Sequence, residues 1–170
     1  MIATIVNAHR QKHPHAADTY ERVLAIGAVI LLGCVIAAVV RGQSDWVRVP
    51  ATVWLHLGTM VVALALKPVM LLRPRGDGLH RRLGWVWVAA MILTAFLSLL
   101  IANPHLNRFS FIHILSVWVL IQTPIIAYAA RNHNIKRHRR GVRAMVTGAL
   151  LIAGFFTFPF NRMLGAWLFG

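Results

Sequence analysis

Four histidines of this 170-residue chain stand at matching places in two stretches of sequence. His80 follows His56 by 24 positions, and His138 follows His113 by 25 positions. Two imidazoles on facing helices of a bundle can hold a six-coordinate haem iron, which transfers electrons rather than binding oxygen. The spacing therefore indicates haem ligation as one chemistry these residues can perform.

The match between the two stretches extends beyond the histidines. Thr59 follows His56 by three positions, and Ser116 follows His113 by three positions. A proline and an arginine also recur at nearly equal distances, and the triplet His-Arg-Arg begins at the second histidine of each stretch. These matches predict two copies of one helical hairpin, related by an axis along the membrane normal.

The composition predicts that the solvent of this chain is a lipid bilayer. Hydrophobic residues make up 58% of it, and only four residues are acidic. The basic residues gather between apolar runs, so the net charge of +14 indicates membrane topology rather than a nucleic-acid partner. Each apolar run is long enough for a helix to cross a hydrocarbon core of about 30 Å. The five runs are Val23–Val40, Ala51–Leu72, Leu83–Ala102, Phe109–Ala130 and Ala144–Phe160.

We therefore expect an all-α integral membrane protein with five transmembrane helices. Its core is a four-helix transmembrane bundle, residues 51–160, built from the repeats 51–102 and 109–160. The expected segments outside this core are a cytoplasmic N-terminal segment (1–22), an accessory transmembrane helix (23–40) and a periplasmic C-terminal tail (161–170).

The distribution of Lys and Arg predicts the orientation. Fourteen of these residues fall before the first run or in the connections after the second and fourth runs, where Lys67 is counted with the connection it precedes, and four fall on the other side. Basic loops are retained in the cytoplasm, so we expect a multi-pass protein of the bacterial inner membrane with a cytoplasmic N-terminus. Trp46, Trp54 and Trp167 would then lie near the periplasmic interface.

This topology places the histidines in two pairs. His56 and His113 would face each other near the periplasm, and His80 and His138 near the cytoplasm, so the sequence predicts two b-type haems with these axial ligands. The first pair lies deeper in its apolar runs than the second, and buried polar groups in membranes tend to be functional. Other site residues are also expected. Thr59 and Ser116 would bond either the second ring nitrogen of a ligand or a backbone carbonyl, and the propionates would be neutralised by Arg81, Arg82, Arg139 and Arg140.

Several stretches resemble a bacterial membrane family catalogued as domain of unknown function 2306. They read HLGTMVVALA, HRRLGWVWVAAMILTAFLS, FSFIHILSVWVL, ARNHNIKRHRRGVRAM and GALLIAGFFTFPFNRML, and lie between about residue 54 and the C-terminus. The chain departs from the family pattern at Asn161-Arg162, where relatives often have Gly-Arg, and at the end of the third run, where they often have a histidine. The resemblance implies no activity. The layout of four histidines on four helices is similar to that of diheme b-type transmembrane cytochromes, an analogy of arrangement alone.

The expected function is transmembrane electron transfer by a diheme b-type cytochrome, an oxidoreductase acting with quinone, superoxide, ferric iron or another small redox partner. Two alternatives stay open. One is a non-enzymatic membrane subunit or assembly factor of a larger complex, and the other is a histidine-based carrier of metal ions or protons. The expected partners are membrane lipid and either a second copy in a homodimer or a larger membrane complex.

Overall fold

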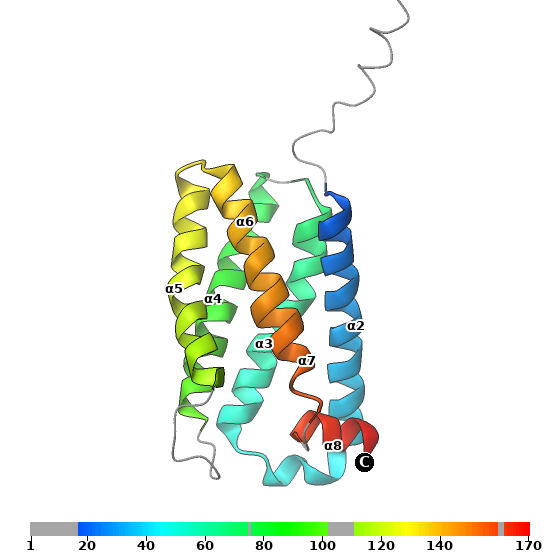
Figure 1. Cartoon of the computed structure of the whole chain (residues 1–170). Coiled ribbons are helices and arrows are strands. Elements are labelled where there is room, and N and C mark those ends of the chain that lie inside the picture. The colour runs from blue at the N-terminus through cyan, green and yellow to red at the C-terminus, as the bar shows by residue number, and fades with distance from the viewer. Residues whose placement is uncertain (1–16, 75, 102–110, 160–161) are drawn as a thin grey trace, which may run out of the picture.

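A computed structural model of the chain describes residues 17–74, 76–101, 111–159 and 162–170, and Figure 1 shows their arrangement. Within these ranges every regular element is helical. The α-helices are α2 (Thr19–Arg41), α3 (Ala51–Leu72), α4 (Gly78–Leu100), α5 (Phe111–Arg131), α6 (Ile135–Met145), α7 (Ala153–Phe155) and α8 (Met163–Phe169). A 3-10 helix, η1 (Gln43–Arg48), follows α2, and a π-helical segment, η2 (Val146–Ile152), joins α6 to α7.

Four of the described helices, α2 to α5, are long and apolar enough to cross a membrane. Their outward faces are apolar as well as their buried faces. On α2, Leu24, Leu31 and Val35 are buried on one side, whereas Val29 and Ile30 are exposed on the other. A helix that is apolar all round needs lipid rather than water on its outer face. These helices make the chain a multi-pass membrane protein.

Five transmembrane helices were predicted, but the described residues contain four helices that are long and apolar enough to cross a membrane. The fifth predicted span, Ala144–Phe160, is not among them. The chain is helical from Ile135 to Phe155, but the first half of this stretch, α6, is dominated by basic residues. Only Ala144 to Phe155 is both apolar and helical, a rise of about 18 Å. That length is short of the roughly 30 Å of a hydrocarbon core.

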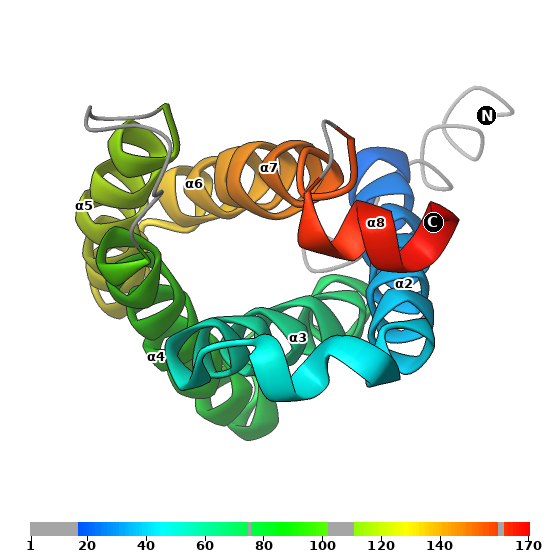
Figure 2. The same ribbon diagram turned by 90° about the horizontal axis from the view of Figure 1, so that it is seen from below.

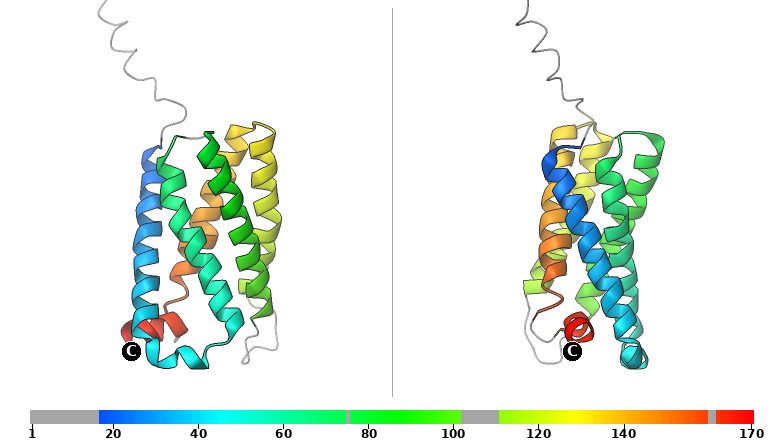
Figure 3. Two further views of the ribbon diagram at one scale, coloured as in Figure 1. Left: turned by 180° about the vertical axis from the view of Figure 1, so that it is seen from behind. Right: turned by 90° about the vertical axis from the view of Figure 1, so that its right-hand side faces the viewer.

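The helices form a ring in which each packs against its neighbours along the chain (Figure 2). Helix α3 contacts α2 and α4, α5 contacts α4 and α6, and α2 closes the ring against η2. The side views show the helices as neighbouring columns of alternating direction (Figure 3). Helix α2 is therefore a wall of the bundle, which differs from the expectation of an accessory helix outside a four-helix core.

We call the end of the bundle where α2, α4 and α6 begin the basic end. At the opposite end, three tryptophans and α8 form a packed cap. The ring of Trp54 lies 5.5 Å from that of Trp46 and 6.2 Å from that of Trp167, measured between centroids. The indole N–H of Trp167 donates to Asp45 at 3.2 Å, and a Cβ atom at Gly42 would overlap the Trp167 ring. The predicted C-terminal tail is thus a short helix held by these contacts.

Candidate functional site

A cavity of about 320 Å³ lies at the basic end of the bundle. Its volume falls at the lower end of the range of small-molecule sites. All five walls of the ring contribute to it, with Glu21 from α2, Lys67 from α3, His80 from α4, Ile126 from α5 and His138 from α6. Two of the four predicted haem ligands, His80 and His138, therefore line one cavity.

Helix caps place these two histidines. Asp77 is the N-cap of α4, which begins at Gly78. Its carboxylate accepts a hydrogen bond from the backbone N–H of His80 at 2.6 Å. The amide oxygen of Asn134 accepts from the backbone N–H of Arg137 at 3.1 Å and begins α6. Each histidine consequently stands in the first turn of its helix, on the two helices that flank α5.

The ring of His138 is also held by a neighbouring helix. Its Nδ1 lies 3.0 Å from the carbonyl oxygen of Ile126 on α5. A carbonyl oxygen can only accept a hydrogen bond, so Nδ1 carries the proton in this contact. Such a bond to Nδ1 sets the tautomer and ring orientation in which Nε2 serves as a metal ligand.

The four predicted propionate partners differ in their placement. Arg81 and Arg139 line the cavity, together with Arg131, which the sequence did not single out. Arg82 and Arg140 are exposed and do not line it. Arg139 is already engaged by a carboxylate from α2.

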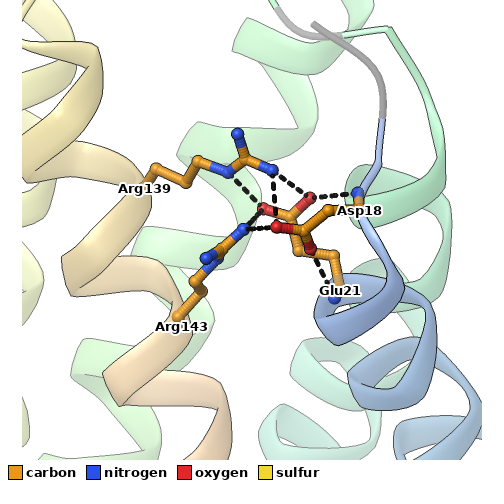
Figure 4. A network of polar contacts seen from close by, with 4 residues as sticks. All are labelled: Asp18, Glu21, Arg139 and Arg143. Atoms are coloured by element: carbon orange, nitrogen blue, oxygen red, sulfur yellow. Dashed lines mark hydrogen bonds and ion pairs between the residues drawn. The ribbon is translucent and has the colours of Figure 1, made fainter. Parts of the chain in front are cut away.

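That carboxylate belongs to the α2–α6 ion-pair network, which comprises Asp18, Glu21, Arg139 and Arg143 (Figure 4). Arg139 donates from two nitrogens to the two oxygens of Glu21 at 2.8 and 3.0 Å, and Arg143 lies 3.2 Å from the same carboxylate. Asp18 pairs with both arginines, at 3.1 Å to Arg139. The network joins the first turn of α2 to α6 across the rim of the cavity.

Two opposing effects set the pKa of Asp18. Burial raises it, but hydrogen bonds from the Glu21 backbone N–H and from Arg143, together with the charges of Arg143 and Arg139, outweigh burial and hold the pKa below its ordinary value of 3.8. The pKa of Arg139 is raised. Its hydrogen bonds to Glu21, together with the negative charges of Glu21 and Asp18, outweigh burial, which lowers it. Asp18 and Arg139 are therefore both ionised at neutral pH.

The stability that Asp18 contributes should be lost in acid. Because the folded state has the lower pKa, this contribution is fully present above the unfolded value near 3.8 and falls as the pH drops through the folded value. We expect the melting temperature of the wild type in detergent to fall more steeply below pH 4, roughly, than that of Asp18→Asn. Parallel acid profiles of the two proteins would contradict the assignment.

The other predicted pair consists of His56 on α3 and His113 on α5. Nδ1 of His56 lies 3.0 Å from the carbonyl oxygen of Thr94 on α4. Helices α3 and α5, which carry the two histidines, both pack against α4. A second haem between His56 and His113 stays a prediction.

The hydroxyls of Thr59 and Ser116 bond backbone carbonyls, which was one of their two expected roles. Thr59 donates to the carbonyl oxygen of His56 at 2.9 Å and accepts from Thr94 at 2.7 Å. Ser116 lies 2.9 Å from the carbonyl oxygen of Ile112 and 3.1 Å from the hydroxyl of Ser98. These bonds link α4 to α3 and to α5.

Two cavity residues, Lys67 and Glu21, were not predicted as site residues. Both residues are only 1% exposed. Lys67 was counted among the loop charges, although it lies inside α3, next to Pro68. A charged residue within an apolar run is by default a functional candidate in a membrane protein, and that signal was available in the sequence.

Comparison with protein-family models, curated proteins and solved structures finds no match to this chain. The resemblance to domain of unknown function 2306 therefore stays a prediction. His9, His13, His15 and His105 lie outside the described residues.

Proposed function

We propose that the chain is a b-type cytochrome of the membrane, which holds a haem between His80 and His138 and transfers electrons. The observation that carries this proposal is that these two histidines, 58 residues apart in sequence, line a single cavity. Bis-histidine ligation between facing helices of a bundle is a common way to hold an electron-transfer haem. The haem would supply one-electron redox chemistry when bound.

The residues around the cavity fit such a cofactor. Trp85, Trp87 and Val88 of α4 and Ala127 of α5 provide apolar walls for a flat macrocycle. Arg81 and Arg131 provide cations for its acidic groups. Gly84 also lines the cavity, and a Cβ atom there would lie 3.8 Å from the terminal methyl of Met70, so a larger side chain would narrow the site.

A free metal ion is less well supported than a haem. Among the described residues, no group of three or more His, Cys, Asp or Glu side chains could hold a metal ion. A haem needs fewer protein ligands because the macrocycle supplies the equatorial nitrogens. This difference favours the cytochrome over the carrier of metal ions.

The orientation and the remaining walls are part of the same proposal. The basic end would face the cytoplasm of a bacterial inner membrane, because basic loops are retained there. The helical stretch from Ile135 to Phe155 would be a fifth wall within the membrane, shielded by α2 and α5. A second haem between His56 and His113 would carry electrons to the opposite face, and quinone or a small redox partner would complete the transfer.

A spectroscopic experiment tests the function. The protein is expressed in haem-replete cells and purified in detergent, and its dithionite-reduced minus oxidised spectrum is recorded with a pyridine haemochrome assay for stoichiometry. We expect an α-band in the wild type and loss of one haem per chain in His80→Ala. The matched variant His56→Ala should retain the haem of the basic end. Wild-type protein without an α-band would overturn the proposal.

A further inference from the structure

The inner end of the cavity is formed by two hydrogen-bond donors, Lys67 and Trp87. Lys67 lies five residues before the end of α3, and Trp87 lies nine residues after the start of α4. At 1.5 Å per residue they stand roughly 7 and 13 Å from those helix ends, deeper than His80 and His138. Nζ of Lys67 lies 3.3 Å from the centre of the Trp87 ring.

Within the described part of the chain, neither donor has a hydrogen-bond acceptor, and the contact of Lys67 there is with the face of the Trp87 ring. The ion pairs found there are made by arginines, and Glu21, the acid in the cavity lining, is held by Arg139 and Arg143. The indole N–H of Trp87 is buried and has no hydrogen-bond partner among the described residues. A buried cation and a buried donor are both costly unless an acceptor compensates them.

We infer that Lys67 and the indole N–H of Trp87 bind a carboxylate of the ligand in this cavity. The inference rests on the proposed function, under which the carboxylate is a haem propionate. The two oxygens of one carboxylate can accept a hydrogen bond from each donor, and the ammonium supplies the counter-charge. Lys67 and Trp87 would thus hold one propionate at the inner end of the cavity, and would supply its counter-charge in addition to the arginines of the lining.

The test compares two porphyrins that differ in this group alone. Full-length protein purified without haem is titrated in detergent with haem and with haem dimethyl ester, whose propionates are uncharged. We expect Lys67→Met to weaken haem binding at least about tenfold, the loss of one charge-assisted hydrogen bond, and to change binding of the ester less than about twofold. Trp87→Phe should shift the same ratio in the same direction, whereas the matched variant Trp118→Phe, at an indole of α5 outside the cavity lining, should leave it unchanged.

The stability of the ligand-free variant separates a binding role from a structural one. Methionine has a similar volume and removes the cost of burying an ammonium, so the melting temperature of ligand-free Lys67→Met should equal or exceed that of the wild type. A lower melting temperature would make Lys67 a structural residue and overturn the inference. Equal weakening of both porphyrins would overturn it while the haem site stands. A wild-type protein that binds neither porphyrin would overturn the proposed function and this inference together.

Discussion

Glu21→Gln is expected to lower the free energy of unfolding by about 3 kcal/mol, at the lower end of the cost of breaking a buried ion pair. Glu21 is 1% exposed and accepts two hydrogen bonds from Arg139 and one from Arg143. The amide cannot balance the charge of two guanidinium groups, which remain at the rim of the cavity. Asp18 still pairs with both arginines, which limits the loss. Reversible unfolding in mixed micelles measures the effect.

Asp18→Asn is the matched control for this prediction. The Asp18 side chain is 34% exposed, so water screens its ion pairs, and we expect a loss of less than about 1 kcal/mol. In the double variant Glu21→Gln/Arg139→Gln the cost should be smaller than the sum of the single costs, because the two residues contact each other. If Glu21→Gln destabilised the protein no more than Asp18→Asn, the network would not hold α2 to α6.

Hydropathy predicted much of the fold, because lipid solvation imposes long apolar runs that are visible in the sequence. Helices α2 to α5 lie within a few residues of the predicted runs. The fifth run misled because a count of apolar residues extends it to Phe160, whereas the helix ends at Phe155 and begins in the basic segment. Hydropathy also cannot show which helices contact each other, so α2 was predicted to lie outside the core.

The site was predicted in part, for reasons that lie in individual residues. The duplicated spacing singled out His80 and His138, which line the cavity together. Its place beside His138 assigned Arg139 to a propionate, but the sequence could not reveal that Glu21, 118 positions away, already binds it. Lys67 was not predicted as a site residue, because a lysine followed by a proline near the end of an apolar run is typical of a loop. The structure shows that α3 continues past Pro68 to Leu72, so Lys67 lies inside the helix.

The four acids show how the chain uses its scarce negative charge. Asp18 and Glu21 join α2 to α6, Asp77 caps α4 and pairs with Arg73 at 3.1 Å, and Asp45 binds Arg48 and Trp167. Each carboxylate thus fixes a helix end. The cavity is left with an excess of cations, which is consistent with an acidic ligand.

His138→Gly is expected to lose haem from the basic end, with affinity lowered at least about tenfold, and added imidazole should restore it. The variant removes both the proposed ligand and the hydrogen bond from Nδ1 to Ile126, so loss of haem alone would not separate ligation from packing. Free imidazole that enters the vacated space can ligate iron but cannot rejoin α6 to α5. Recovery of the low-spin reduced spectrum therefore reports ligation.

His133→Gly is the control that gives this experiment its force. His133 also lines the cavity, but it lies in the turn between α5 and α6 with a φ of 53°, a conformation that glycine adopts without strain. The substitution should leave both the spectrum and the stability close to those of the wild type. A folded His138→Gly protein whose spectrum imidazole cannot restore would indicate that His138 positions α6 rather than binds iron. Equal loss of haem in both variants would assign the effect to the shape of the cavity, because both residues line it.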